Sequence, residues 1–254
     1  VRDFLKMQMQ YKHIVVLTGA GISAESGIPV FRSETGLWEQ ERIEDVCVPE
    51  ALVRNPLKVH DFYNRMRASL AQKQPNEAHR ALALLQKKLR EIPGTELTLV
   101  TQNIDDLHER AGSDGVCHMH GELLSMLCQN CGKRFKFAGR SHPDDICPHC
   151  KKRGGVRPDI VFFGEMPYHM EFIEEKLAAC DLFLAVGTSG VVYPAAGFCR
   201  FAKSRGALCV EFNLEKSAVA TDFDYGLYGK ASITLKAFTE VLMKSGTALS
   251  QLPR

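Results

Sequence analysis

The sequence predicts an α/β fold, in which a Rossmann-like parallel sheet domain carries an inserted small domain that four cysteines mark as zinc-binding. Short apolar runs alternate with helical patterns, a glycine-rich turn follows the first run, and two Cys-x-x-Cys pairs stand in the middle of the chain. Alternating strands and helices favour a parallel sheet with crossover helices. The 254 residues are enough for one large unit with an insertion.

Five apolar runs have the length and composition of strands that are buried on both faces. They cover residues 14–17, 97–101, 182–186, 207–212 and, more briefly, 232–235. Helical spacing of apolar residues occurs over 78–92 and 171–180. The first four runs end in "TGAGIS", "TQNIDD", "GTSGVV" and "FNLEKS", which are polar or contain glycine. Because ligands of parallel sheets bind beyond the carboxyl ends of the strands, these segments are the expected site.

The turn after the first run, "GAGISA" at residues 19–24, fits the dinucleotide fingerprint G-x-G-x-x-G/A. In this fingerprint, glycines let main-chain N–H groups approach a pyrophosphate at the start of a helix. A dehydrogenase would continue to a second strand with an acidic end about 20 positions on, and no such strand follows. Residues 25–45 have the composition of a long loop. We expect this loop to cover the cofactor, with Phe31 and Arg32 reaching its reactive end.

Two cysteine pairs, Cys128-x-x-Cys131 and Cys147-x-x-Cys150, are separated by fifteen residues. This spacing brings four thiolates to one tetrahedral centre, the geometry of a closed structural zinc site. Two disulfides or a redox pair are the alternatives. The other cysteines stand singly in apolar or helical surroundings, where free thiols behave as small buried hydrophobes. They are Cys47, Cys117, Cys180, Cys199 and Cys209.

Composition excludes some functional classes. The net charge of +2 gives no electrostatic footprint for nucleic acid. No run approaches the roughly 18 apolar residues of a membrane span, and 45% hydrophobic with 24% charged residues is typical of a soluble globular protein. The single cysteines favour an intracellular reducing compartment, either the cytoplasm or the mitochondrial matrix.

One histidine stands at a junction. His120 precedes Gly121 where the sheet must connect to the cysteine-containing insertion, and such junctions form clefts. Imidazole, with an unperturbed pKa of about 6.5, suits proton transfer near neutral pH. His118 and His108 are rivals on the same chemistry. No G-x-S-x-G elbow is present, so hydrolysis through an acyl-serine is weakly supported.

Several motifs occur along the chain in one order: "GAGISAESGIP", "TQNIDDLHERAG", "HGE", the cysteine pairs, "RPDIVFFGE", "GTS" and "FNLE". In this order they resemble the sirtuins, the NAD-dependent protein lysine deacylases, from about residue 11 to residue 243. The likeness is closest to the bacterial and mitochondrial branch that handles acidic acyl groups as well as acetyl. It implies one catalytic domain over 1–254, with a NAD-binding lobe of residues 8–45, 75–117 and 166–243, a helical part of the small lobe at 46–74, and a zinc-binding module at 118–165.

The resemblance also implies the chemistry: NAD+ and one structural Zn2+ as cofactors, and release of nicotinamide, O-acyl-ADP-ribose and free lysine. His120 would be the general base toward a ribose hydroxyl, while Asn103 and Asp105 would orient the carboxamide and a bound water. Gln102 would hold the ribose, and Phe31 would block the return of nicotinamide. From residue chemistry alone, the "QNIDD" side chains are also explained as a stabilised turn.

The cofactor-binding residues that the resemblance implies follow the strand ends. They are Gly19, Ala20, Gly21, Ala24, Phe31, Arg32, Trp38, Gln102, Asn103, Ile104, Asp105, His120, Gly187, Thr188, Ser189, Asn213, Leu214, Glu215 and Ala231.

Substrate capture, by the same likeness, would pair the peptide backbone with "VRPDIVFFGE" on one side and a loop around "GVVYP" on the other. Hydrophobicity alone equally favours a plain core strand. The implied substrate-binding residues are Cys47, Tyr63, Met66, Val161, Phe163, Gly164, Glu165 and Val191.

The acyl pocket departs from its nearest relatives. Desuccinylating sirtuins carry Tyr-x-x-Arg on a helix, whereas here Tyr63 is followed by Met66 at the arginine position. Arg65 would point elsewhere on a helix, and Arg67 is the one remaining candidate cation. Cys47 takes the place of a small alanine on the pocket wall. Loss of a desolvated partner of a carboxylate costs on the order of 2–5 kcal/mol, so we expect acetyl and neutral acyl groups to be favoured over succinyl, malonyl and glutaryl.

Three alternatives stay open. A desuccinylase or demalonylase results if Arg67 substitutes for the missing arginine. Mono-ADP-ribosyl transfer to protein shares the nicotinamide cleavage and differs only in the acceptor. A non-catalytic zinc-ribbon module would need a basic, aromatic face, which the charge balance disfavours. The expected partners are acyl-lysine peptides or proteins, with no nucleic acid and no membrane, and the expected state is a monomer.

Overall fold

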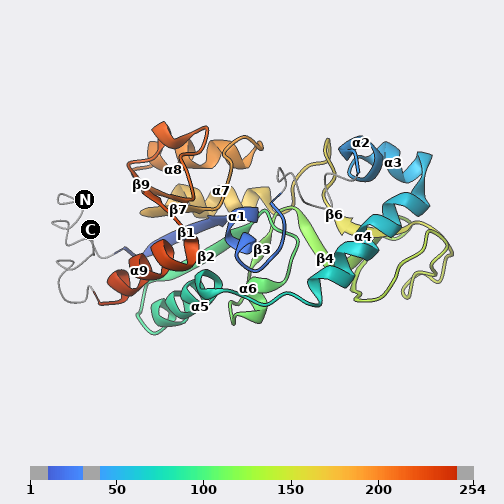
Figure 1. The fold of residues 1–254 in the computed structure, drawn as a ribbon, viewed down its shortest axis with the longest axis horizontal. Helices are drawn as coiled ribbons and strands as arrows, with labels where there is room; N and C mark the ends of the chain where they lie inside the picture. Colours follow the sequence, from blue (N-terminus) through green and yellow to red (C-terminus); the bar gives the residue numbers. More distant parts are fainter. Residues whose placement is uncertain (1–10, 31–40, 245–254) are drawn as a thin grey trace.

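The computed structural model describes residues 11–30 and 41–244. These residues form two lobes, a large one built on a parallel sheet and a smaller one that holds a short antiparallel sheet and three helices (Figure 1). Phe31, Arg32 and Trp38, three of the expected cofactor residues, lie outside the described residues.

The large sheet has six parallel strands in the order β3-β2-β1-β7-β8-β9. They are β1 (His13–Thr18), β2 (Glu96–Thr101), β3 (Cys117–His118), β7 (Leu182–Val186), β8 (Leu208–Asn213) and β9 (Tyr225–Tyr228). Thr18 pairs with Thr101 on one side and Val186 on the other. The three central strands therefore end level, and their carboxyl-terminal turns meet at one edge of the sheet.

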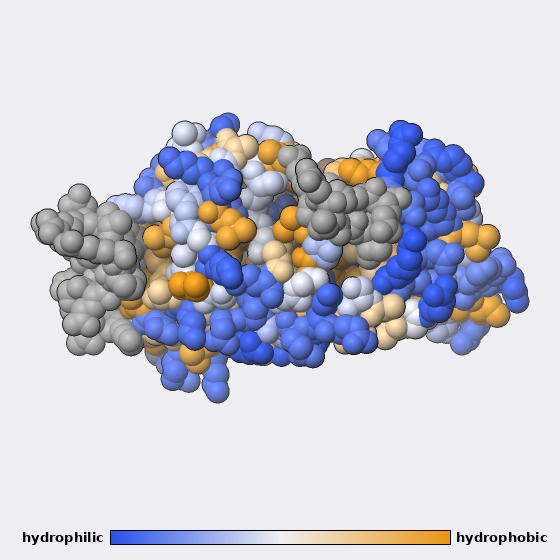
Figure 2. All heavy atoms as spheres, viewed as in Figure 1, coloured by the Kyte–Doolittle hydropathy of each residue, from blue (hydrophilic) through white to orange (hydrophobic). Residues whose placement is uncertain are grey.

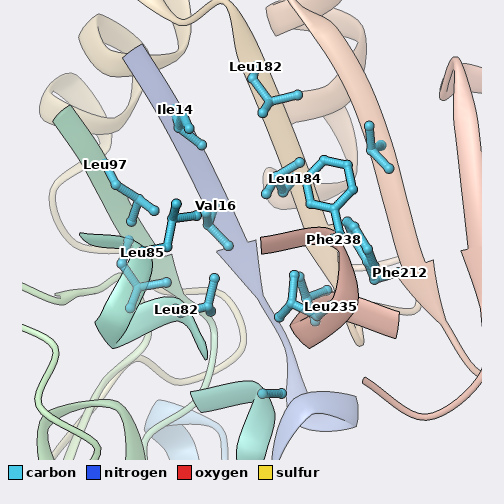
Figure 3. Close-up of a cluster of buried hydrophobic side chains, with 14 of the residues drawn as sticks. Ile14, Val16, Leu82, Leu85, Leu97, Leu182, Leu184, Phe212, Leu235 and Phe238 are labelled. Atoms are coloured by element: carbon cyan, nitrogen blue, oxygen red, sulfur yellow. The ribbon is translucent and has the colours of Figure 1, made fainter. Parts of the chain in front are cut away.

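Helices cover both faces of this sheet. α5 (Glu77–Arg90) and α9 (Ala231–Lys244) pack on one face, and α7 (Met170–Ala179) and α8 (Phe198–Ser204) pack on the other. Figure 3 shows the first of these layers, where Leu82 and Leu85 of α5 and Phe238 of α9 meet Val16 and Leu184 of the strands. All five side chains are at most 2% exposed, so the periodic apolar residues of α5 and α9 bury their stripe on the sheet.

The first four predicted strands are confirmed within two residues at each end, but the fifth is wrong. Residues 232–235 lie in α9, and the edge strand is β9 instead. A short apolar run cannot be assigned to helix or strand by periodicity alone. Here Leu235 and Phe238, three residues apart, both face the core at 0% and 2% exposure, which is helical spacing.

The small lobe contains the antiparallel sheet β5-β4-β6. Its strands are β4 (Gly121–Cys128), β5 (Arg134–Lys136) and β6 (Val156–Ile160). The helices α2 (Ile43–Val46), α3 (Pro49–Arg54) and α4 (Pro56–Leu70) form one buried apolar cluster with β4 and β6. The expected loop over residues 25–45 thus ends in a helical turn at Ile43, and its residues 31–40 are not described.

Short elements complete the chain: α1 (Ala20–Ala24), α6 (Leu107–Arg110), η2 (Ala195–Gly197) and η3 (Ala220–Asp222). Within the described ranges no helix is long and apolar enough to span a bilayer. In the view of Figure 2, exposed apolar side chains form small separate groups on a mainly hydrophilic surface.

Candidate active site and metal centre

The turn after β1 is packed directly on the turn after β7. The N–H of Gly19 donates to the oxygen of Val186, and the N–H of Gly21 donates to that of Gly187, each at 2.9 Å. A Cβ on Gly21 would lie 2.6 Å from the Cα of Gly187, so no larger residue fits. These two N–H groups are therefore taken within the protein. They are not the pyrophosphate donors that the glycine fingerprint suggests.

Asn103 and Asp105 follow β2 and are nearly buried, at 8% and 6% exposure. The Nδ2 of Asn103 donates to the oxygen of Gly19 at 3.1 Å and to the Oγ of Ser23 at 3.2 Å. Its Oδ1 has no partner among the described residues, so this oxygen is available as an acceptor. Asp105 accepts from Ser23 at 3.0 Å and from the N–H of Leu107 at 3.1 Å. Burial raises the pKa of Asp105, and these hydrogen bonds oppose the rise.

The hydrogen-bond chain beneath these residues begins at α5. The N–H of Asn76 donates to His79 Nδ1 at 3.3 Å, so the ring proton is on Nε2, which faces Ser23 Oγ at 3.4 Å. Ser23 thus accepts from His79 and Asn103 and donates to Asp105. His79 is fully buried, and burial lowers its pKa to about 4, so it stays neutral. His79 is not among the site residues expected from the sequence; its place three residues after the capping Asn76 was the signal available.

Three histidines near this edge differ in what their ring nitrogens face. The Nδ1 of His120 faces the main-chain oxygen of Gln102 at 3.1 Å and so carries the proton, which leaves Nε2 as a lone-pair acceptor. Burial lowers the pKa of His120. His108 is fully buried and donates from Nε2 to Thr18 Oγ1 at 2.9 Å, because that hydroxyl itself donates to Thr101.

His118 has no free lone pair. Its Nδ1 faces the main-chain oxygen of Asn103 at 3.1 Å, and its Nε2 faces the carboxylate of Glu109 at 2.8 Å. Both partners are acceptors, so the imidazolium satisfies both. Of the three candidates, His120 alone combines partial exposure with an unprotonated nitrogen that has no described partner.

The turns after β7 and β8 lie at the same edge of the sheet. Asn213 donates from Nδ2 to the oxygen of Thr188 at 2.8 Å and to Glu211 Oε1 at 3.2 Å, which leaves its Oδ1 without a described partner. Gln102 and Thr188 line one small cavity, so the turns after β2 and β7 do meet.

The remaining expected cofactor residues are less enclosed. Ser189, Leu214 and Glu215 are exposed, with Leu214 at 67%, and Ala231 is half-buried at the start of α9. Ala20 and Ala24 are half-buried in α1. Ile104 packs instead against the apolar cluster of the small lobe, and its oxygen accepts from Leu123 at 2.8 Å.

The segment after β6 connects His120 to the small lobe. The N–H of Val161 donates to the oxygen of His120, and the N–H of Phe163 donates to the oxygen of Cys47, each at 2.9 Å. Glu165 closes the turn by accepting from Arg157 at 2.6 and 3.1 Å. Phe163 is 44% exposed despite its apolar side chain. Gly164 follows at φ +92°, a conformation that favours glycine. Val191, in the turn after β7, is 37% exposed.

Cys47 and Tyr63 are buried together below this segment, at 5% and 0% exposure. The hydroxyl of Tyr63 donates to Cys47 Sγ at 3.5 Å, and its ring stacks on Phe162 at 6.0 Å between centroids. Burial raises the pKa of both groups, so both stay neutral. Met66 packs against the same cluster. Arg157 is the cation nearby, and Glu165 neutralises it.

Both arginines beside Met66 are bonded away from this cluster. Arg65 pairs with Glu41 at 2.8 Å. Arg67 is 3% exposed and donates to Gly139, Leu123, Asn64 and Ser141, at distances of 2.7 to 3.2 Å.

The four paired cysteines form one cluster in the small lobe. The Sγ atoms of Cys128, Cys131, Cys147 and Cys150 all lie within 4.8 Å of one another. Two of the separations, Cys128 to Cys150 and Cys131 to Cys147, are 3.8 Å. A tetrahedral zinc with Zn–S bonds of about 2.3 Å needs S–S edges of about 3.8 Å. The residues present therefore fit a structural zinc ion, as the spacing predicted. The five single cysteines are buried and free, as expected.

Comparison with known proteins agrees with this architecture. The sequence model of the Sir2 family matches residues 19–194. An NAD-dependent protein deacylase of Salmonella typhimurium is 50% identical over 238 residues, which cover 93% of this chain and 86% of that protein.

Solved structures agree as well. A Sir2 homologue in complex with NAD superposes with a TM-score of 0.84 at 36% identity, covering 96% of this chain and 94% of the other. A Sir2 variant with a deacetylated p53 peptide and 3′-O-acetyl ADP-ribose gives 0.77 at 30% identity, covering 97% and 98%. Because the family match spans more than half of the chain and the deacylase aligns across nearly all of it, this chain belongs to the Sir2 family.

Proposed function

We propose that this chain is an NAD-dependent protein lysine deacylase that releases nicotinamide, O-acyl-ADP-ribose and free lysine. The observation that carries this proposal is His120: its Nε2 is unprotonated and has no partner among residues 11–30 and 41–244, and it lies at the edge where the parallel strands end. Relatives named as deacylases, and Sir2 structures with NAD or a deacetylated peptide, support the same activity.

NAD, when bound, supplies a ribose carbon that accepts the acyl oxygen once nicotinamide leaves. Around it, the Oδ1 of Asn103 is proposed to hold the carboxamide or a water, because its Nδ2 is already committed to Gly19 and Ser23. Asp105 contributes a buried acceptor fixed by Ser23. On the far side, the outward Oδ1 of Asn213 suits a ribose hydroxyl donor. Preorganised groups of this kind stabilise developing charge without rearranging during the reaction.

The general base is proposed to be His120. Its Nδ1–H is held by the oxygen of Gln102, so Nε2 is the atom that takes the proton from a ribose hydroxyl. The oxygen of His120 accepts from the N–H of Val161, so a main-chain hydrogen bond joins the proposed base to the proposed peptide-pairing segment. Backbone pairing along Val161 to Gly164 provides affinity with little sequence reading, and Phe163 and Val191 add exposed apolar contacts beside the lysine.

The acyl preference follows from the cluster under the lysine. Cys47, Tyr63 and Met66 present neutral groups, and the arginines of α4 are bonded elsewhere. A carboxylate placed there would lose its hydration without gaining a cation. We therefore infer a preference for acetyl and other neutral acyl groups, and Arg67 is not proposed as a substitute cation because five contacts already hold it.

The zinc site is proposed to be structural. Four cysteine ligands leave no open coordination position for catalysis. The protein is further proposed to act as a monomer on acyl-lysine proteins, without nucleic acid, in a reducing compartment of the cell, which its buried free cysteines support.

The test is product analysis by mass spectrometry after incubation with a panel of acyl-lysine peptides, with and without NAD. We expect free lysine, nicotinamide and acyl-ADP-ribose in equal amounts, and only with NAD. His120→Tyr should abolish all three, while His142→Tyr, at an exposed histidine, should not. Lysine released without NAD contradicts the proposal, and ADP-ribose left on protein identifies the mono-ADP-ribosyltransferase alternative.

A further inference from the structure

His118 is a buried histidine that the proposed mechanism does not use. It ends β3, is 8% exposed, and lies two residues before the base His120. The two histidines donate to adjacent carbonyls of the turn after β2: His120 to Gln102 and His118 to Asn103, each at 3.1 Å. Both hydrogen bonds therefore hold the turn that presents Asn103.

The two rings differ in what the second nitrogen faces. The Nε2 of His120 is open, whereas that of His118 is 2.8 Å from Glu109 Oε1 on α6. If His118 were neutral, one of its nitrogens would point a lone pair at an acceptor. In a neutral His118 beside the Glu109 carboxylate, the single ring proton would stay on Nε2. The lone pair of Nδ1 would then face the main-chain oxygen of Asn103 and repel it. Only the imidazolium holds both contacts.

We propose that His118 is a positioning residue that must be doubly protonated, held so by Glu109, to keep Asn103 in its catalytic orientation. This inference rests on the proposed deacylase function. It predicts that activity needs one histidine charged and its neighbour neutral, so kcat rises as His120 loses its proton and falls as His118 loses its own.

The charges around His118 support this state. Burial opposes its protonation, but the hydrogen bond and charge of Glu109 outweigh it and raise the pKa of His118. The negative charge of Glu122 on β4 also raises the pKa of His118. Asp105 also attracts the imidazolium, and the buried His108 interacts with it while its own pKa is lowered by burial, so His108 adds no positive charge. Because the pKa of His118 is raised in the folded protein, the contact is present below that pKa and is lost as pH rises through it.

The first experiment measures protonation directly and does not depend on activity. In protein carrying 15N-labelled histidine, with His118→Gln used for assignment, both ring nitrogens of His118 should be protonated at pH 7 and should titrate above pH 6.5. In Glu109→Gln the midpoint should fall. Glu91→Gln, the same change at an exposed carboxylate paired with Lys88, should leave it in place. A His118 that is neutral at pH 7, or unmoved in Glu109→Gln, overturns the proposal.

The second experiment is the pH profile of kcat with an acetyl-lysine peptide. In the wild type, kcat should decline above the measured pKa of His118, with little change in the KM of the peptide. In Glu109→Gln, the new amide donates to Nε2 and the ring keeps its proton on Nδ1, so the alkaline decline should disappear. A decline that persists unchanged, or a uniform loss at every pH, contradicts the positioning role.

A double variant separates charge from shape. His118→Gln should lower kcat, because the glutamine side chain has one NH2 group for two acceptors. If that NH2 donates to Asn103, the amide oxygen faces the carboxylate of Glu109; if it donates to Glu109, it no longer reaches Asn103. Combined with Glu109→Gln, the pair again forms a donor and acceptor chain, and kcat should recover. No recovery would mean that Glu109 and His118 do not act as one unit. Absence of NAD-dependent deacylation in the wild type would instead overturn the proposed function and leave the NMR result standing.

Discussion

Asn103 shows how neighbouring groups decide what one side chain presents. The residue type offers both a donor and an acceptor to a ligand. Its Nδ2 donates to Gly19 and Ser23, so only Oδ1 is left for a ligand. The Nδ2 of Asn213 likewise donates to Thr188 and Glu211. Both amides therefore offer an acceptor oxygen to a ligand's hydroxyl or amide protons.

Met66 is the residue that should decide acyl preference. Met66→Arg places a cation three residues after Tyr63 on α4, where the two share a face. A desolvated charge pair is worth on the order of 2–5 kcal/mol, so the ratio of kcat/KM for succinyl to acetyl peptide should rise at least tenfold. Steady-state kinetics on matched peptides measure it. Met66→Leu, which conserves volume, should keep the wild-type ratio. A wild-type enzyme that prefers succinyl would refute the assignment of a neutral pocket.

If His120 is the base, as proposed, its protonation should set the acid limit of activity. Burial lowers its pKa below the usual 6.5, and the base must be unprotonated to act. The kcat/KM should therefore hold from neutral pH down to below 6.5 and fall only at more acidic pH. A profile of kcat/KM between pH 5 and 7.5 measures the midpoint, with His142→Gln as the control at an exposed histidine. A midpoint above 6.5 would contradict the neutral, buried base.

At the scale of elements, α4 uses its two faces for different tasks. Tyr63 and Met66 face the acyl cluster. His60, Asn64 and Arg67 recur at helical spacing on another face, and all three contact Ser141 of the cysteine-containing module. The N–H, the oxygen and the hydroxyl of Ser141 are each bonded to α4, at 2.7 to 2.9 Å. The module thereby fixes the position of α4, the helix that carries Tyr63 and Met66.

Ser141→Ala tests this docking contact. It removes the hydroxyl that pairs with His60 and Arg67 and leaves buried polar groups unsatisfied, at a cost of about 1–3 kcal/mol in the free energy of unfolding. Because α4 carries the pocket, the KM of the acyl peptide should rise while the Kd of NAD stays constant. Denaturant melts and binding assays check both. Ser204→Ala, at an exposed hydroxyl, should change neither, and an unchanged KM in Ser141→Ala would contradict the coupling.

At the scale of the whole molecule, the proposed active-site edge lies between a large lobe and a module that contains the four-cysteine cluster. The large lobe buries apolar layers on both faces of its sheet. The buried cluster beside the cysteines is small, with Met126 and Val156 as its fully buried members besides cysteine. A core of this size provides little stability by itself, so the module depends on its metal.

Zinc removal should therefore unfold the module selectively. After chelation we expect loss of about one equivalent of zinc, lost deacylation, and a lower melting temperature with most of the helical circular dichroism retained, because α5, α7, α8 and α9 belong to the large lobe. Added Zn2+ should restore activity, and Mg2+, which prefers oxygen ligands, should not. Full activity in protein shown to be zinc-free would contradict a structural role.

Much of this architecture is local in origin and was predictable. The apolar runs of β1, β2, β7 and β8, the helical stripe of α5 and the two cysteine pairs are each encoded within a few residues. His120 was ranked first only through the resemblance. The prediction of a strand at residues 232–235 was wrong, because a four-residue apolar segment is too short to show whether its period is that of a strand or a helix. Packing against the sheet determined that these residues belong to a helix.

Taken by itself, the sequence determined the fold class, the metal centre and the set of chemically able residues, because these depend on residue type and short-range spacing. Tertiary structure alone decided which atoms of those residues are free. The N–H groups of Gly19 and Gly21 are consumed by β7, Arg67 is bound to the cysteine module, and His118 is held between two acceptors. Each partner is distant in sequence, and hydrogen bonds between distant segments exist only once the chain has folded.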